Sequence, residues 1–405
     1  MRTKRLIVLL ALSALWIAGC AQFETNHPND AAIPVAGYHE EGEAGEPPLP
    51  TSSGASRPLD LHFDEIQGDI RNIHYADGHQ MFLTADRLYL YNLDTGRVTA
   101  ETSKEAFDQE RYWVIQDGYV AVGLKINSGG SSGGLSATDG GITYRAIFYD
   151  HQLNQRSGFD FSKLLKANEL ILSLKAIAFS ADGTQAAYAT TAGLYLYDFN
   201  TKQKTTVVDL TAEDAKARSG VVTFEQIGFT NEDKKIAFKA QSFDIPAVPG
   251  KPSFDTCGTV NPDGSGLANR TFDGYTCKEL TAYDKLLLLA EDFTIPSGKI
   301  LVMEMPSGKT KLHTLSEKRE SGFVSGSDFG RYFATTLADR TGWKIRVYDT
   351  GTGKLEAEHR ISHDGEAGYM ANDPIVKIID DKRIYMVLLG ANQEGIQTKV
   401  IVSPF

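Results

Sequence analysis

A short unit of strands and turns recurs along most of this chain and restricts its fold more than any other feature. The clearest copy is Ala176–Lys202, which reads AIAFSADGTQAAYATTAGLYLYDFNTK. Its apolar stretches have the length of strands and are separated by SADGT, TAG and NTK, of which Asp-Gly supplies the positive φ of a tight hairpin. Together with KTTVVDL, which follows directly, the unit predicts four short antiparallel strands.

Further copies of the unit are spaced roughly 50 residues apart along residues 59–405, a period typical of radial repeats. They lie at Ile73–Val98, Tyr112–Leu153, Ile227–Lys239, Ala282–Thr310, Ser327–Lys354 and Lys377–Val402. Sheets of this size bury both faces only by packing against neighbours around a ring. We therefore predict an all-β fold, a β-propeller of four-stranded antiparallel blades. The spacing favours seven blades and leaves six or eight open, and we expect Leu61–Ile66 to complete the last sheet beside Thr398–Val402.

Two parts of the clearest copy carry a family resemblance. Phe179–Thr184 (FSADGT) and Gly193–Lys202 (GLYLYDFNTK) resemble the WD40-like repeats of TolB-type bacterial propellers. Asn261–Leu267 (NPDGSGL) resembles the DGSG turn of the same group, whereas the Trp-Asp ending of eukaryotic WD40 repeats is absent. The resemblance implies the propeller fold but not an activity, because propellers serve as enzymes, scaffolds and ligand binders.

The amino terminus predicts export. Arg2, Lys4 and Arg5 precede an apolar run that is shorter than the roughly 20 residues of a membrane-spanning helix. This order is typical of a secretory signal. Ile17–Cys20 (IAGC) resembles the lipobox of bacterial lipoproteins, with Ile in place of the commoner Leu. The resemblance implies a signal peptide at residues 1–19 and lipid attached to Cys20, with an ordinary secretory signal or an uncleaved anchor as alternatives.

Residues 20–58 differ in composition from the rest of the chain. They are rich in Pro, Gly, Ser and Glu and offer few large apolar groups, so they cannot offset the entropy of ordering. We predict a disordered tether between the lipid and the propeller. Ala21, rather than Asp, follows the cysteine, which by the same resemblance implies the outer membrane if the host has two membranes, and otherwise the cell membrane. Either site faces the extracytoplasmic side of a bacterial cell envelope.

Net charge restricts the partners. The chain carries −11, and removal of residues 1–19 would leave −14. A balance this acidic argues against nucleic acid or an anionic lipid surface as the main partner. We expect contact with the membrane through the N-terminal lipid alone, and a protein or glycan partner at the propeller rim.

Two cysteines remain once Cys20 is assigned to lipid. Cys257 and Cys277 form an even pair in an exported chain, where disulfides persist. We predict a bond between them that closes a loop rich in Gly, Asn and Asp and contributes about 3 kcal/mol. A two-cysteine metal site is the alternative, although no CxxC and no neighbouring His supports it.

Two insertions interrupt the repeats. Residues 127–141 are Gly- and Ser-rich but lack the phosphate-loop pattern GxxxxGK[ST], so we expect a hairpin tip. Residues 243–278 are our first choice for a binding surface, with an inert decoration as the alternative, because recognition usually lies on loops held by a rigid scaffold.

Motifs for catalysis are not found in the sequence. There is no GxSxG elbow, no HExxH and no EF-hand loop. We therefore assign no catalytic residue, no metal ligand and no cofactor, and expect Asp182, Asp198 and Asp349 to cap turns.

These observations favour a non-catalytic binding or scaffold module that is anchored to the cell envelope and recognises a protein or an envelope polymer. The alternatives are an extracytoplasmic propeller enzyme of the lyase or glycosidase type, and the sensor component of a signalling pair. Asp, Glu, His or Arg side chains that converge on the central mouth would favour the enzyme. Small apolar and hydroxyl groups there would favour binding.

Overall fold

A computed structural model gives the fold of the compact unit at residues 54–405. It describes residues 59–405 except 62, 69, 77–78, 104–106, 108, 127–141, 231–233, 243–254, 271–274, 281–285, 292–296, 305–307, 321–323, 328–329, 339–341, 363–373, 380–381 and 393–394. The predicted signal peptide (1–19), lipidated Cys20, tether (20–58) and insertion 127–141 lie outside the described residues.

The clearest sequence repeat forms the sheet that was predicted for it. β10 (Ile177–Phe179), β11 (Gln185–Thr190), β12 (Gly193–Asp198) and β13 (Gln203–Asp209) pair in that order, each antiparallel to the next. Gly183 takes φ of +71° in the first turn, and the Asp182 carboxylate accepts a hydrogen bond from the Thr184 backbone N–H at 2.9 Å. Asp-Gly therefore builds this hairpin as expected.

Across the described residues the strands form seven antiparallel four-stranded sheets, which we call blades and number along the chain. Blade 1 is β2 (Asn72–Ala76), β3 (Gln80–Thr84), β4 (Leu88–Asn92) and β5 (Arg97–Glu101). Blade 2 is β6 (Gln109–Ile115), β7 (Gly118–Ile126), β8 (Ile142–Tyr149) and β9 (Gln155–Asp160). Blade 3 is β10 to β13. The prediction of an all-β propeller with four-stranded blades is confirmed.

The second half of the ring repeats the same order. Blade 4 is β14 (Val221–Phe229), β15 (Ile236–Ser242), β16 (Asp255–Val260) and β17 (Ala268–Arg270). Blade 5 is β18 (Tyr275–Leu280), β19 (Leu286–Glu291), β20 (Lys299–Glu304) and β21 (Thr310–Thr314). Blade 6 is β22 (Val324–Gly326), β23 (Tyr332–Ala338), β24 (Gly342–Asp349) and β25 (Leu355–Ser362). Blade 7 is β26 (Ile375–Ile379), β27 (Arg383–Asn392), β28 (Gly395–Pro404) and β1 (Leu59–Leu61).

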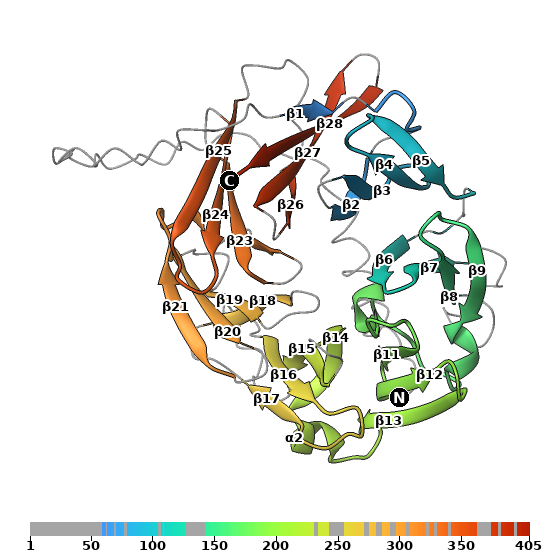
Figure 1. The fold of residues 1–405 in the computed structure, drawn as a ribbon. Helices are drawn as coiled ribbons and strands as arrows, with labels where there is room; N and C mark the ends of the chain where they lie inside the picture. Colours follow the sequence, from blue (N-terminus) through green and yellow to red (C-terminus); the bar gives the residue numbers. More distant parts are fainter. Residues whose placement is uncertain are drawn as a thin grey trace, which may run out of the picture. The chain divides into compact units, whose positions relative to one another are not determined.

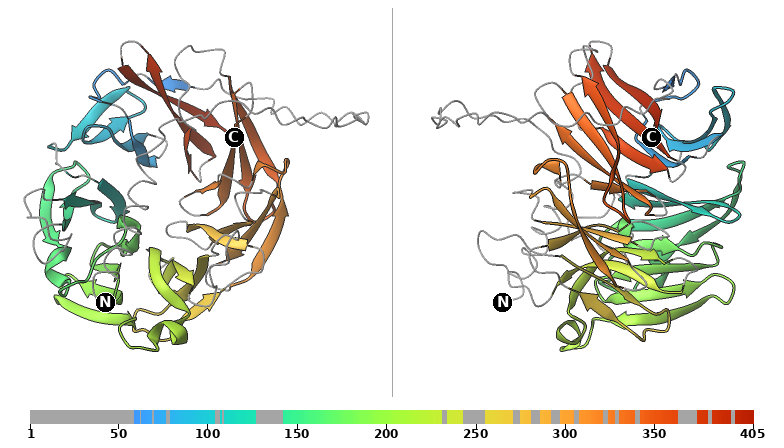
Figure 2. Two further views of the ribbon diagram at one scale, coloured as in Figure 1. Left: turned by 180° about the vertical axis from the view of Figure 1, so that it is seen from behind. Right: turned by 60° about the vertical axis from the view of Figure 1, so that its left-hand side comes forward.

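The blades follow one another around a closed ring, with the first strand of each at the inside (Figure 1). Each inner strand contacts the inner strand of the next blade, from β2 through β6, β10, β14, β18 and β22 to β26, and β26 contacts β2 again. Figure 2 shows the same ring from behind and from the side.

The ring is closed by strands from both ends of this unit. β1 pairs antiparallel with β28, and Leu59, Asp60 and Leu61 lie opposite Val402, Ile401 and Val400. The partner strand is the predicted one, but the N-terminal strand ends where Leu61–Ile66 was expected to begin. Residues 64–65 form a turn instead.

Short helices occur in the links between blades. Two 3-10 helices, η1 (Phe161–Leu164) and η2 (Leu174–Ala176), connect blades 2 and 3, and α2 (Ala215–Ser219) connects blades 3 and 4. Within the described part of the chain, no helix is both long and apolar enough to cross a membrane. Because the strands of each blade alternate in direction, the blade-to-blade links leave from the same face of the ring as the turns between second and third strands. We call this face the link face.

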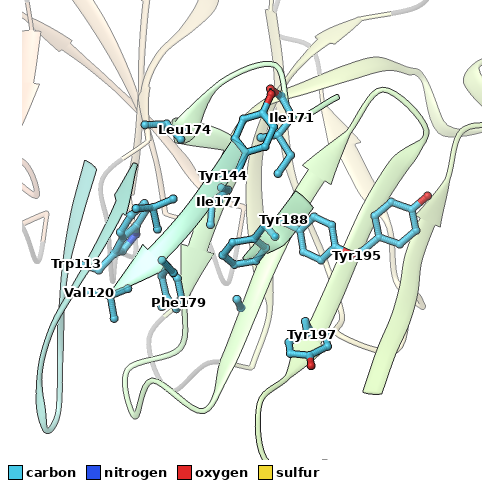
Figure 3. Packing of buried hydrophobic residues seen from close by; sticks show 14 of the residues in the cluster. Trp113, Val120, Tyr144, Ile171, Leu174, Ile177, Phe179, Tyr188, Tyr195 and Tyr197 are labelled. Atoms are coloured by element: carbon cyan, nitrogen blue, oxygen red, sulfur yellow. The ribbon is translucent and has the colours of Figure 1, made fainter. Parts of the chain in front are cut away.

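Apolar side chains between neighbouring blades form the core. Between blades 2 and 3, Trp113, Tyr144, Phe179 and Tyr188 are buried with residues of the η1–η2 link (Figure 3). The Tyr144 hydroxyl donates a hydrogen bond to the Ile171 carbonyl oxygen at 2.8 Å, so this large side chain is buried with its polar atom satisfied. The blades are therefore fixed by side chains that neither sheet buries alone.

The expected insertion at 243–278 differs from the structure. Its residues 255–260 and 268–270 are β16 and β17, the third and fourth strands of blade 4, and residues 275–278 begin β18 of blade 5. The described part of this segment therefore completes one blade and begins the next. Both strands are polar in sequence and lie among Gly-, Asn- and Asp-rich turns, so the sequence pattern did not indicate strands there.

Candidate functional site

Basic side chains from three neighbouring blades come together at the inner strands near the link face. His74 lies on β2 of blade 1, and Arg71 directly precedes that strand. Arg111 lies on β6 of blade 2 and Lys377 on β26 of blade 7, the two inner strands that contact β2. We call Arg71, His74, Arg111 and Lys377 the inner-strand cationic cluster. It is a local concentration of positive charge on a chain whose net charge is −11.

His74 is the centre of the cluster and is held among aromatic rings. Its ring centroid lies 4.3 Å from that of Tyr112 and 5.4 Å from that of Phe82. Its Nε2 is hydrogen-bonded to Oγ1 of Thr84. Burial, followed by the positive charges of Lys377, Arg111 and Arg71, lowers the pKa of His74 to about 3. The imidazole is therefore neutral at physiological pH, and the charge of the cluster comes from the two arginines and the lysine.

Arg71 is positioned by two fixed partners. Its Nε donates to the Ala85 carbonyl oxygen at 2.7 Å, and its Nη2 forms an ion pair with Glu110 of β6 at 3.0 Å. More than half of the Arg71 side chain, 57%, remains exposed. Arg111 lies over the ring of Trp113, with 5.1 Å between the guanidinium carbon and the ring centroid. Both guanidinium groups are thus oriented by the scaffold.

A small cleft lies beside the cluster, between blades 1 and 2. It has about 260 Å³ of empty space, with open solvent included. It is lined by Asp86, Arg87, Leu88, Thr102, Phe107, Glu110, Tyr112, Ala121 and Tyr149. Because this space includes open solvent, the cleft is a shallow depression and encloses no pocket of the size that a small-molecule substrate needs.

Arg, His and Glu side chains come together here, and this is the pattern that would favour an enzyme. The protonation state of each group therefore has to be considered. A general base works best with a pKa near the working pH, but the pKa of His74 is near 3. Burial and the neighbouring Glu110 raise the pKa of Tyr112, and its hydroxyl is hydrogen-bonded to Glu110 and Thr84. Glu110 itself is paired with Arg71. The arrangement suits the binding of negative charge better than proton transfer.

Metal ligation has no support in the described residues, where no group of three or more His, Cys, Asp or Glu side chains is placed to hold an ion. His359 lies on β25, and His363 lies outside the described residues. Asp182, Asp198 and Asp349 each accept backbone hydrogen bonds within their own turns, which confirms their structural role.

The two cysteines are brought together in the structure, and the disulfide between them stays a prediction. Cys257 lies on β16 and Cys277 on β18, and both are buried, free thiols that are hydrogen-bonded to each other. The structure thus contains two adjacent thiols where we expected a disulfide. A bond between them would close the loop of residues 258–276 and would also join two blades, because β16 belongs to blade 4 and β18 to blade 5.

Sequence reasoning missed a buried charge network at the junction of blades 5 and 6. Arg346 of β24 pairs with Glu317 at 2.8 Å, with Glu358 at 2.7 Å and with the fully buried Glu320. Tyr348 donates a hydrogen bond to the same Glu320 carboxylate. Burial would lower the pKa of Arg346, but the surrounding carboxylates raise it. Lys344 pairs with Glu317 and Arg360 with Glu358, so three cations balance the three carboxylates. The network holds the link before blade 6 against β24, and we assign it a structural role.

Comparisons with known proteins add no argument on the fold or the function of this chain. Neither a protein-family model nor a curated protein matches the chain. A similar solved structure is the β-propeller domain of Cps50 (Swd1) from Myceliophteria thermophila. It is 11% identical, with a TM-score of 0.49, and the match covers 85% of this chain and 98% of that one. We draw no functional argument from this likeness, and the strand order of the blades establishes the propeller independently.

Proposed function

We propose that this protein is a lipid-anchored binding module of the bacterial cell envelope whose propeller holds an acidic partner at the inner-strand cationic cluster. The observation that carries the proposal is the convergence of Arg71, Arg111 and Lys377 from three blades around a neutral histidine. Guanidinium groups held in place by the scaffold bind carboxylates and phosphates with directional hydrogen bonds. The partner is an acidic segment of a protein or an envelope glycan that carries such groups.

The anchor is argued from residues 1–20. A basic head, a short apolar run and the IAGC sequence support export and attachment of lipid to Cys20. Two or more acyl chains hold a protein firmly at a membrane, whereas one binds only marginally. A tether at residues 20–58 would let the propeller reach partners away from the bilayer. The protein would act on the extracytoplasmic side, at the outer membrane of a two-membrane cell or at the membrane of any other.

The anchor is tested by metabolic labelling with an alkyne-bearing palmitate analogue and by cell fractionation. We expect label and membrane retention for the full chain and the loss of both in Cys20→Ser. If the Cys20→Ser protein keeps the label, or the full chain never carries it, the lipid anchor is wrong.

The binding site is tested with a triple variant, Arg71→Gln, Arg111→Gln and Lys377→Gln. Its control is Arg97→Gln, Arg156→Gln and Lys299→Gln, which makes the same charge change at exposed positions on three other strands. The probes are polygalacturonate and poly-L-glutamate, each measured at low and at physiological ionic strength. We expect the inner-strand variant to lose most of its binding to at least one probe while the control keeps it. Equal binding by both variants would show that the inner-strand cationic cluster is not the binding site.

A second candidate, an enzyme that acts on an acidic polysaccharide, is favoured by the presence of His74 and Tyr112 beside the cations. The same polygalacturonate samples distinguish it, because a lyase forms unsaturated ends that absorb near 235 nm, and a glycosidase forms reducing ends. If the protein turns over polygalacturonate and His74→Gln abolishes this turnover, the protein is an enzyme and the proposed binding module is wrong. Binding without turnover supports the module.

A further inference from the structure

The two buried cysteines lie at the junction of blades 4 and 5. Cys257 is on the third strand of blade 4 and Cys277 is on the inner strand of blade 5, and these strands contact each other. The exposed fractions of the two side chains are 0% and 1%. Both belong to one apolar cluster with Ala237, Leu280 and Met303, and their thiols are hydrogen-bonded to each other. Two sulfur atoms on different sheets are thus already neighbours.

Hydrogen bonds fix the two strands on both sides of Cys277. The Asp255 backbone N–H donates to Thr276 Oγ1 at 3.0 Å, and the Gln226 side-chain amide donates to the Leu280 carbonyl oxygen at 2.8 Å. Both bonds cross from blade 4 to blade 5. The relative position of the two cysteines is therefore set by their neighbours and does not depend on a bond between the sulfur atoms.

A partly buried ion triad lies on the blade 4 side of the pair. Lys239 is the register partner of Cys257, and its ammonium group lies 3.0 Å from Asp255 and 3.3 Å from Glu225. Burial alone would lower the pKa of Lys239, but the two carboxylates raise it. Lys239 therefore stays charged next to the thiols, where a positive charge favours the thiolate.

We propose that Cys257 and Cys277 form a disulfide in the exported protein, a covalent clasp between blades 4 and 5. The inference rests on the proposed function to this extent, that a lasting disulfide needs the oxidising surroundings of an exported chain. The chain has three cysteines, so lipid on Cys20 leaves this pair as its remaining thiols.

The reaction needs an oxidant, which we take to be the disulfide of a thiol oxidoreductase or of oxidised glutathione. The thiolate of one cysteine attacks this disulfide and expels one thiolate. The second cysteine thiolate then attacks the mixed disulfide and expels the other. One S–S bond forms in the protein and one is broken in the oxidant. The two electrons lost by the cysteine sulfurs reduce the oxidant's sulfurs, which take up two protons at neutral pH.

Burial determines when the bond forms. Once blades 4 and 5 are packed together, an oxidant has no access to thiols that are 0% and 1% exposed. Burial also raises the pKa of Cys277, which reduces the thiolate needed for attack. The bond therefore forms during folding, before the two blades close on each other, and a chain that folds in reduced form stays reduced.

The geometry is tested by refolding the reduced, urea-unfolded full chain in a mixture of reduced and oxidised glutathione. Free thiols are then blocked and peptides are mapped without reduction. We expect a Cys257–Cys277 cross-linked peptide, and reaction of the folded, reduced chain with a thiol reagent roughly tenfold or more slowly than that of the unfolded chain. Refolded protein in which Cys257 and Cys277 are free or glutathione-bound would overturn the proposal, whatever the state of Cys20.

Measurements of stability distinguish a disulfide bond from ordinary packing of two thiols. Oxidised protein should resist urea more than Cys257→Ala, Cys277→Ala and the double variant, and both single variants should match the double, because either one removes the bond. A reductant present throughout should bring the parent protein close to the variants. If the oxidised and reduced parent unfold at the same urea concentration, no clasp contributes to the fold.

The same mapping is done on full chain recovered from exporting cells, with the state of Cys20 measured in each sample. The cross-linked peptide is expected together with lipid on Cys20. Lipidated protein with two free thiols would overturn the clasp while leaving the anchor intact. Protein without lipid would overturn the anchor, and the refolding result would then decide the pairing alone.

Discussion

The surroundings of His74 in the folded ring make the stability of the protein depend on pH. Burial and the charges of Lys377, Arg111 and Arg71 lower its pKa to about 3, whereas an unfolded histidine has a pKa near 6.5. Between these values the unfolded chain binds a proton that the folded chain does not, so the free energy of unfolding falls as pH is lowered, by up to about 1.4 kcal/mol per pH unit.

Replacement of His74 by Phe, which fits between Phe82 and Tyr112, should therefore flatten this part of the pH dependence. The measurement is urea unfolding of both proteins at a series of pH values between about 3 and 6.5. His313 and His359 also have lowered pKa values because of burial, so the variant should lose only part of the slope. An unchanged slope would mean that His74 is protonated in the folded ring.

Arg346 and Arg360 allow a comparison of the stability that is lost when a buried and an exposed arginine are each replaced. Only 8% of the Arg346 side chain is exposed, and its removal leaves the buried Glu320 without its cation. Arg346→Met should therefore cost about 3–5 kcal/mol. Arg360 pairs with Glu358 but is 69% exposed, so Arg360→Met should cost less than about 1 kcal/mol. Chemical unfolding of the two variants measures this contrast. If both variants lose the same free energy of unfolding, the network does not have the structural role that we assign to it.

At the scale of elements, the closing strand β1 is three residues long and yet joins the two ends of the ring. Deletion of residues 59–61 removes its pairing with Val400–Val402 and should cost about 2 kcal/mol, at roughly 1 kcal/mol per hydrogen bond lost. Deletion of residues 51–53, which keeps β1, is the matched control. Thermal unfolding and limited proteolysis near β28 report the difference. If both deletions behave alike, β1 does not close the ring.

The sequence predicted those elements whose strands are apolar and whose turns contain Asp-Gly or Gly, such as β10 to β13. It failed for β16 and β17, because DTCGTV and ANR have too few large apolar residues to show a strand pattern. The inner-strand cationic cluster was also not predicted. Arg71, Arg111 and Lys377 are far apart along the chain, and only the contacts of β26 and β6 with β2 bring them to His74. Periodicity specifies the strands, but it does not specify which side chains meet at the centre of the ring.

At the scale of the whole ring, blade 3 has the best described apolar packing. Among the described residues, the cluster between blades 2 and 3 contains seventeen buried residues. The cluster between blades 3 and 4 is as large as the first. Blade 3 is therefore packed on both faces by large apolar clusters, and the ion network around Arg346 lies at the junction of blades 5 and 6.

The large clusters on both faces of blade 3 predict which part of the ring opens last. Regions open locally with free energies set by their buried contacts, so amide hydrogens of β11 and β12 should exchange more slowly than those of β20 and β23. Hydrogen exchange of the full chain, followed by mass spectrometry of its peptides, measures this order. Reduction of a Cys257–Cys277 bond should speed exchange in β16 and β18 before it affects β11. Equal exchange rates in all blades would show instead that the ring opens as one cooperative unit, in which local packing does not determine where opening begins.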